Sequence, residues 1–169
     1  QILVENGANI NHLNIFNRTA LQEAVIRANN RIVNYLLQIT RTVSNCDIYG
    51  NNLIFDAISN GNIDIIKRIA SIKEININQI NNDGNTILHK DIVLKNNELA
   101  LLLIDFGADP TILDKEGKSF LFYCISEGIK NISVLQKVVL LGYDINNKNG
   151  QNKTLLMESI NYYLDTPKD

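Results

Sequence analysis

The side chains best suited to catalysis or metal binding are few in this chain of 169 residues. Its histidines and cysteines are His12, His89, Cys46 and Cys124. None of them has the spacing of a zinc site, and no glycine-rich phosphate loop, nucleophile elbow or HExxH motif occurs. Close carboxylates such as Asp105 and Asp109 are more often simply solvated. The sequence therefore predicts no catalytic residue, no metal and no cofactor, so we do not expect an enzyme.

The elements that carry these residues are clearest between residues 81 and 110. A polar turn at Asp83-Gly84 precedes Thr86, a side chain suited to cap the amides at the start of a helix. An apolar helical pattern then runs to Leu94, and a second one runs from Leu99 to Gly107, where glycine can close the helix. A unit of this size has an apolar face that it cannot bury alone, which predicts further copies.

Four columns of equivalent residues show those copies. Helix-capping residues recur at intervals of 33, 34, 33 and 35 positions: Thr19, Asn52, Thr86, Ser119 and Thr154. Residues that tolerate positive φ precede them: Asn17, Gly50, Gly84, Gly117 and Asn152. Large aliphatic residues follow two positions after the caps: Leu21, Ile54, Leu88, Leu121 and Leu156. Small or compact residues follow five positions after them: Ala24, Ala57, Asp91, Cys124 and Ser159. Because Asp91 is the charged member, we expect it to meet Lys90 or Lys118 or to lie exposed.

These columns resemble the ankyrin repeat, whose opening reads D-x-x-G-x-T-P-L-H-x-A and whose close reads G-A-D-x-N. Residues 81–91 read N-N-D-G-N-T-I-L-H-K-D, and the chain closes units with Gly7-Ala8-Asn9 and Gly107-Ala108-Asp109. The family's proline is absent throughout, and its histidine survives only as His89, which the resemblance implies ties neighbouring turns together. The resemblance implies an all-α solenoid of stacked helix–turn–helix units with hairpin-like turns.

The predicted organisation is a single ankyrin-repeat domain over residues 1–169, with about four full repeats and partial ends. Its expected parts are a partial repeat at 1–13, full repeats at 14–46, 47–80, 81–113 and 114–148, and a partial repeat at 149–169. Because the chain starts without Met, on the tail of a helix, we expect it to be a fragment and, as a fragment, to be monomeric. Cys46 and Cys124 fall in different repeats, so no disulfide is expected.

Composition and charge narrow the classes of partner that this chain is expected to bind. Hydrophobic residues make up 45% of the chain and charged residues 20%, and the formal net charge is −2. This near-neutral charge argues against nucleic acid, and no apolar run is long enough for membrane insertion. Reduced cysteines indicate an intracellular, cytoplasmic setting. The abundance of Asn and Ile is typical of AT-rich genomes, so the cytoplasm of a host cell is an alternative.

The resemblance implies a non-catalytic interaction module that binds a protein or peptide on a concave face of turn tips and first helices. The candidate contact residues on this face are Ile15, Phe16, Arg18, Arg27, Ile48, Tyr49, Asn51, Asn82, Asp83, Lys115, Glu116 and Lys118. Exposed aromatics beside arginine are typical of binding hot spots. An open alternative is that Phe16 and Tyr49 pack on each other or on a missing neighbour.

Two other functions stay open. The repeats could recruit substrates for a catalytic domain outside this chain, as part of a larger enzyme or of an effector directed at a host. The chain could also be a substrate itself, because ankyrin repeats resemble targets of asparaginyl hydroxylases and Asn11 and Asn146 occupy turns after the closing motifs.

Overall fold

The computed structural model describes residues 2–40, 43–94, 96–126 and 132–165; within its helices, the side chains at 91–94, 126 and 161–165 lie outside the description. Contacts between Cα atoms divide the chain into two compact units, Gln1–Asn82 and Asp83–Asp169. Ten helices and no β-strand occur in the described residues, which confirms the all-α prediction. The placement of one repeat domain over the whole chain remains a prediction.

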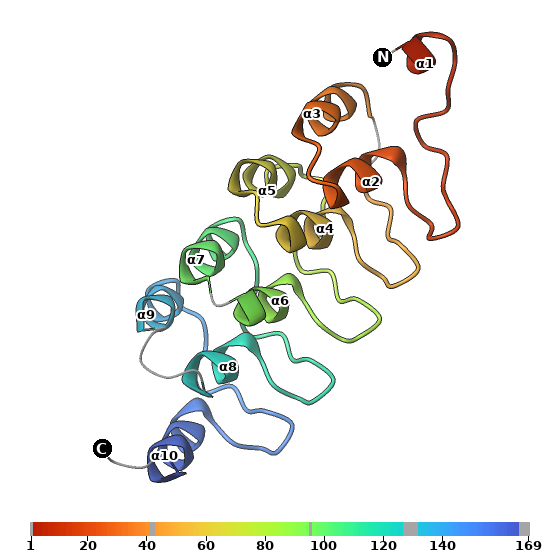
Figure 1. The fold of residues 1–169 in the computed structure, drawn as a ribbon. Helices are drawn as coiled ribbons and strands as arrows, with labels where there is room; N and C mark the ends of the chain where they lie inside the picture. The colour runs from red at the N-terminus through yellow and green to blue at the C-terminus, as the bar shows by residue number, and fades with distance from the viewer. Residues whose placement is uncertain (1, 41–42, 95, 127–131, 166–169) are drawn as a thin grey trace. The chain divides into compact units, whose positions relative to one another are not determined.

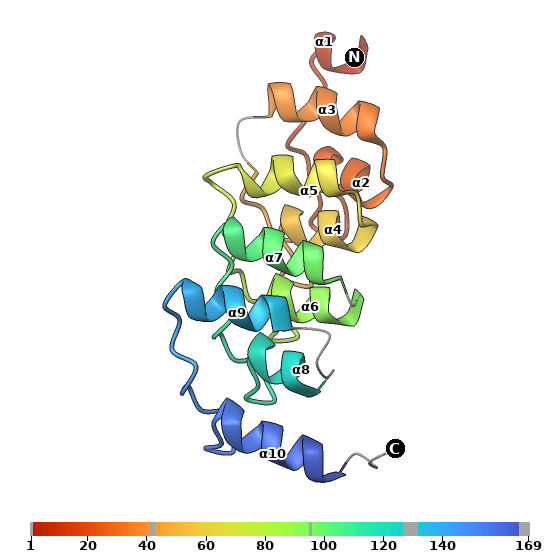
Figure 2. The ribbon, with the colours of Figure 1, turned by 90° about the vertical axis from the view of Figure 1, so that its left-hand side faces the viewer.

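The first unit contains α1 (Ile2–Glu5), α2 (Ala20–Ile26), α3 (Asn30–Ile39), α4 (Leu53–Asn60) and α5 (Ile63–Ala70). Helix α2 packs on α3 and α4, and α4 packs on α5. Figures 1 and 2 show α2 beside α4 and α3 beside α5, so the helices form two layers. Fully buried side chains such as Val25, Val33, Ile54 and Ile66 fill the space between these layers.

The second unit repeats this arrangement with α6 (Ile87–Leu94), α7 (Asn97–Asp105), α8 (Phe120–Ser126), α9 (Ile132–Leu140) and α10 (Leu155–Asp165). Helix α8 packs on α6, α9 and α10, and α7 packs on α6 and α9. Buried Leu88, Leu103, Leu121 and Val134 occupy its core.

The predicted turn column agrees with the structure at every position, and the predicted caps Thr19 and Thr154 accept a backbone N–H of the helix that follows. Positive φ occurs at all five predicted residues: Asn17, Gly50, Gly84, Gly117 and Asn152. The first helix of each repeat begins one residue after its predicted cap. Asn52 differs in chemistry, because its side chain makes no cap bond to α4 and instead donates to the Asn76 carbonyl at 2.8 Å. Thr19 does cap α2, with Gln22 completing a capping box.

The column of aliphatic residues and the column of small residues are both buried in the four predicted full repeats, wherever the structure describes their side chains. Leu21, Ile54, Leu88 and Leu121 are 2% exposed or less, whereas Leu156 on α10 is 72% exposed. Ala24, Ala57 and Cys124 are buried as well. The side chain of Asp91, and the predicted loop at 128–131, lie outside the described residues.

Four turns are shaped by a first residue whose Oδ1 accepts two backbone N–H groups: Asn14, Asp47, Asp114 and Asn149. Asp47 accepts from Tyr49 at 2.9 Å and from Asn51 at 3.0 Å, and Asp114 accepts from Glu116 and Lys118, both at 2.9 Å. Backbone bonds close the base of the same turns, for example from the Asp47 N–H to the Asn51 carbonyl at 2.9 Å. Isolated β-bridges join Leu113 to Ser119 and Lys148 to Thr154, so these turns are hairpin-like as predicted. Short side-chain acceptors of this kind hold a turn while its tip residues stay free to vary.

Candidate protein-binding surface

The tips of the first two turns expose large apolar side chains. Ile15 is 88% exposed, Phe16 39%, Ile48 49% and Tyr49 50%. We call these four residues, together with Arg18, the tip patch. Large apolar side chains that gather at one place on an exposed surface often mark an interaction site. Neither ring is buried within this chain, and the alternative that they pack on a missing neighbour stays a prediction.

Arg18 lies between the two aromatic rings of the tip patch. Its Cζ atom is 5.6 Å from the centroid of the Phe16 ring and 5.9 Å from that of the Tyr49 ring. Both distances are within the range of a cation–π interaction. The guanidinium therefore joins the tips of two consecutive turns.

Asp47 holds this guanidinium in place through two hydrogen bonds. Its Oδ2 accepts from Arg18 Nη2 at 2.7 Å and from Nε at 3.1 Å, and the Asp47 side chain is fully buried. Burial lowers the pKa of Arg18, but the hydrogen bond and charge of Asp47, with the charges of Asp56 and Glu23, raise it overall. Arg18 thus stays charged while its charge is compensated within the protein.

Backbone bonds hold neighbouring turns of the first unit in register. The Ile48 N–H donates to the Phe16 carbonyl at 3.1 Å, and the Asn82 N–H donates to the Tyr49 carbonyl at 2.9 Å. Asn82 Nδ2 also donates to the Ile48 carbonyl at 2.9 Å. The tip patch therefore sits on a bonded framework of three turns.

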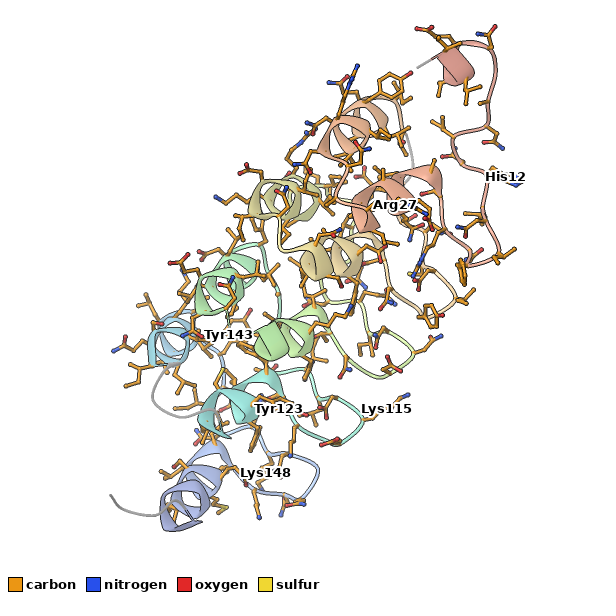
Figure 3. All side chains as sticks on the ribbon, in the orientation of Figure 1. His12, Arg27, Lys115, Tyr123, Tyr143 and Lys148 are labelled. Carbon is orange, nitrogen blue, oxygen red and sulfur yellow. The ribbon has the colours of Figure 1, made fainter. Side chains whose placement is uncertain are left out.

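A different cluster occupies the turn of residues 114–118 in the second unit. Tyr123, on α8, donates its hydroxyl to Asp114 Oδ2 at 2.6 Å, and the Lys118 Nζ lies 5.7 Å from the Tyr123 ring centroid. His89 packs edge-on against the same ring, with centroids 5.9 Å apart. Figure 3 shows Tyr123 on α8 and Lys115 extending from the tip of this turn.

Burial and hydrogen bonds together set the pKa values in this second cluster. Burial raises the pKa of Tyr123, and its bond to Asp114 raises it further. Burial alone would raise the pKa of Asp114, but bonds from Tyr123 and from the Lys118 and Glu116 N–H groups hold it below its usual value. At neutral pH the pair is a protonated phenol donating to a carboxylate.

His89 connects two turns, as the family resemblance implied. Its Nδ1 lies 2.9 Å from Thr86 Oγ1 and 3.2 Å from the Thr86 N–H, while its Nε2 lies 3.1 Å from the Lys118 carbonyl. Gln22 holds the equivalent position in the first unit, where its Oε1 accepts from the Thr19 N–H at 3.0 Å and from Asn45 Nδ2 at 3.1 Å. The amide thus takes over part of the role of the missing histidine.

Known proteins with this arrangement carry the same repeat. The family described as ankyrin repeats (3 copies) matches residues 1–81. The Xenopus laevis Notch-regulated ankyrin repeat-containing protein is 30% identical over 95 residues, covering 53% of this chain and 82% of that protein. This chain belongs to the ankyrin-repeat family.

Two further ankyrin-repeat proteins are similar over more of the chain. The Escherichia coli putative ankyrin repeat protein YahD is 29% identical over 143 residues, which are 80% of this chain and 70% of YahD. The crystal structure of the ankyrin repeat domain of Bcl-3 superposes with a TM-score of 0.80 at 19% identity, covering 96% of this chain and 75% of that one. Several other curated relatives are much longer, since the chain spans between 19% and 25% of them. Ankyrin repeats generally mediate protein–protein interaction.

The other predicted contact residues are distributed over both units of the ankyrin-repeat chain. Arg27 is exposed and pairs with Glu23 at 3.5 Å, and Asn51 accepts from Asn81 Nδ2 at 3.0 Å. Exposed positions elsewhere are Asn82, Asp83, Lys115 and Glu116, while Lys118 is half-buried. Within the first unit, Arg18 lies close to the rings of Phe16 and Tyr49, and Ile15 and Ile48 adjoin these rings in sequence.

Sequence reasoning missed Asp47 and Tyr123, which organise the two clusters. A signal for Tyr123 exists in the spacing of nine residues between the first residue of a turn and a position on the following helix, whereas the contact of Asp47 with Arg18 spans 29 positions. Asn14 Nδ2 donates to Glu23 Oε1 at 3.0 Å across this spacing, as Tyr123 does to Asp114. A column of polar side chains at this helix position would have pointed to the contact.

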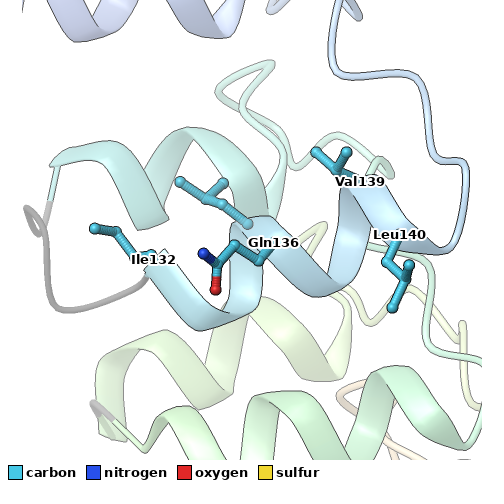
Figure 4. A pocket seen from close by; sticks show the side chains of 5 residues that line it. Ile132, Gln136, Val139 and Leu140 are labelled. Carbon is cyan, nitrogen blue, oxygen red and sulfur yellow. The ribbon is translucent and has the colours of Figure 1, made fainter.

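A second apolar surface lies on α9 (Figure 4), where Ile132, Leu135, Gln136, Val139 and Leu140 line a shallow hollow of about 400 Å³. Val139 is 56% exposed and Leu140 82%. Unlike the tip patch, this surface carries no charged side chain among its lining residues.

In the described part of the chain, no three His, Cys, Asp or Glu side chains lie together as a metal site would require. Across the same residues, no helix is long and apolar enough to cross a membrane. Cys46 is half-buried and Cys124 buried, and both are free thiols. His12 is exposed in the turn before α2.

Proposed function

We propose that this chain is a non-catalytic interaction module that binds a protein or peptide partner through its turn tips and first helices. The tip patch is the main contact in this proposal. In the second unit, the exposed Asp83, Lys115 and Glu116 remain candidate contacts of mixed charge.

The observation that carries this proposal is the exposure of Phe16 and Tyr49 on two turns that are rigidly joined. Aromatic and arginine side chains contribute most to binding energy when a partner removes them from water. Here the rings are held by Arg18 and the backbone by bonds between turns, so little conformational entropy is lost on binding. Tyr49 at 50% exposure and Ile15 at 88% retain enough free surface for such a contact.

The proposal is tested by capture from a cell lysate with three immobilised proteins: wild type, Phe16→Ala/Tyr49→Ala, and the control Val139→Ala/Leu140→Ala on α9. Circular dichroism first establishes that all three are folded. We expect the tip variant to lose a protein that wild type and the α9 variant both retain, identified by mass spectrometry. Loss in the α9 variant and retention in the tip variant would move the binding surface to α9 and refute the proposal.

A further inference from the structure

Resting on the proposed function, we infer that the tip patch recognises an uncharged segment of its partner. An apolar side chain of that segment contacts Ile15 and Tyr49, and a main-chain carbonyl accepts from the free end of the Arg18 guanidinium. Arg18 is then a hydrogen-bond donor of fixed direction and does not serve to attract an acidic partner.

The charge of the patch favours a neutral partner. The Arg18 guanidinium is already bonded to the fully buried Asp47 carboxylate. The charges of Asp56 and Glu23 raise its pKa as well, so three carboxylates act on one cation here. The exposed Arg27 pairs with Glu23 at 3.5 Å and offsets part of that negative charge. A carboxylate from a partner would be a fourth acid beside this cation, whereas a carbonyl oxygen brings no net charge to it.

The guanidinium still has donors to offer. Of its five N–H groups, those bonded to Asp47 belong to Nε and Nη2, on one edge of the plane. The remaining N–H groups make no hydrogen bond to a described residue, and the side chain is 19% exposed. Because Phe16 and Tyr49 pack near its faces, the free edge points in a set direction. A planar, pre-oriented donor of this kind suits a carbonyl acceptor.

The apolar side chains beside that edge supply the second half of the contact. Ile15 is the most exposed of them at 88%, and Ile48 and Tyr49 are about half exposed. Asp47 is buried beneath them, and no exposed acid lies at the tips of residues 15–18 and 48–51. An apolar anchor next to a backbone acceptor therefore complements the patch in both shape of surface and charge.

The test uses a displayed library of random peptides of about twelve residues, an extended segment in length. Peptides are selected on wild type, and the dissociation constant of each enriched peptide is measured by fluorescence polarisation. Measurements at about 50 mM and about 500 mM NaCl separate apolar from ionic recognition, because screening weakens exposed charge pairs. The variants are Phe16→Ala/Tyr49→Ala, Arg18→Lys, and Ile32→Ala as a control, since Ile32 on α3 is 45% exposed and lies outside the patch.

We expect enriched peptides to share an aromatic or aliphatic residue without enrichment in Asp or Glu. Their affinity should change less than about twofold with salt, and Phe16→Ala/Tyr49→Ala should weaken it at least about tenfold. Arg18→Lys should weaken it as well, because lysine keeps the charge but lacks the planar edge. Ile32→Ala should leave it unchanged.

The other outcomes distinguish failure of this inference from failure of the proposed binding site. Acid-rich peptides whose affinity falls steeply with salt would overturn this inference and leave the tip patch as the binding surface. Peptides that bind the double aromatic variant as well as wild type, or no enrichment over a blank support, would overturn both the inference and the proposed site. The salt measurement needs only wild type, so it decides the question even if Arg18→Lys unfolds.

Discussion

The turns around Asp47 and Asp114 share the same backbone hydrogen bonds but differ in the side chains that they expose. Both aspartates accept two backbone N–H groups of their own turn through Oδ1 and use Oδ2 for one longer side chain. For Asp47 that side chain is Arg18 of the preceding turn, and the aromatic rings remain exposed. For Asp114 it is Tyr123 of its own repeat, and the ring is used inside the cluster. The two turns thus differ in the partner of Oδ2 and in their tip residues, which are apolar at 15–16 and 48–49 but charged at Lys115 and Glu116.

This comparison shows how a repeat separates framework from function. The residue with positive φ has the same task in each copy, and the predicted cap keeps its place before the first helix even where, as at Asn52, it makes no cap bond. The residues between them vary and determine which groups meet at the surface. A difference of a few side chains is therefore enough to make one turn a candidate contact and another a closed cluster.

The largest effect should come from the turn glycines of the two regions. A Cβ atom at Gly117, where φ is +73°, would lie 2.5 Å from the Cα atom of Gly150, whereas at Gly50 its nearest atom would be the Asn82 Oδ1 of a side chain at 2.7 Å, with the Asn82 backbone N farther away at 3.0 Å. Gly117→Ala should cost about 3 kcal/mol, from left-handed strain plus a backbone collision, and Gly50→Ala about 1 to 2 kcal/mol. Urea unfolding followed by circular dichroism measures both. Equal costs would show that the neighbouring turn yields as easily as a side chain.

Arg18→Ala tests whether the cation stabilises the first region. It leaves the buried Asp47 carboxylate with only its two backbone donors. The free energy of unfolding should fall by about 2 kcal/mol, because a buried charge loses its partner. Arg27→Ala is the matched control, with a side chain 77% exposed and a change expected within about 0.5 kcal/mol. Similar small changes in both variants would mean that Asp47 does not depend on Arg18.

Tyr123→Phe removes the bond that closes the second region. The lost donor bonds a carboxylate at 2.6 Å in a half-buried position. We expect a loss of about 1 kcal/mol in the free energy of unfolding. Tyr49→Phe is the control, because the Tyr49 hydroxyl makes no hydrogen bond to a described residue and should lose almost nothing. If the two substitutions have equal effects, the proposed contrast between an occupied and a free ring is wrong.

The smallest effect should be the pH dependence that His89 gives to the second region. Burial lowers the pKa of His89, against weaker raising effects of the Lys118 carbonyl and the Asp114 charge. The folded protein therefore binds fewer protons at this site than the unfolded chain. Its stabilisation is complete above the ordinary pKa of about 6.5 and is lost as pH falls through that value toward the folded pKa.

Unfolding free energies of wild type and His89→Gln at about pH 7.5 and about pH 5.0 measure this term. Wild type should lose more stability on acidification than the variant does. Gln22 already makes similar bonds in the first unit, so glutamine is a fair neutral replacement. A variant with the same pH slope as wild type would show that His89 does not titrate in the unfolding transition.

The repeat periodicity, the turn residues with positive φ and the starts of the first helices followed from residue types alone. These features depend on local backbone chemistry: which residues tolerate a left-handed conformation, which cap a helix, and where apolar side chains recur. Asn52 marks the boundary of this reasoning. Its type suits a cap, but the nearby Asn76 carbonyl engages its amide instead.

The surface depended on contacts between segments far apart in sequence. Arg18 reads as a free charge until Asp47, 29 positions later, is found to bond it, and Phe16 and Tyr49 become one patch only because both rings meet that guanidinium. From the sequence, Tyr123 could be a core or a surface aromatic residue, and only the structure shows that its hydroxyl donates to Asp114. Local preferences place the turns and helices, but the pairing of variable side chains across turns is set by distances that arise only when the repeats stack.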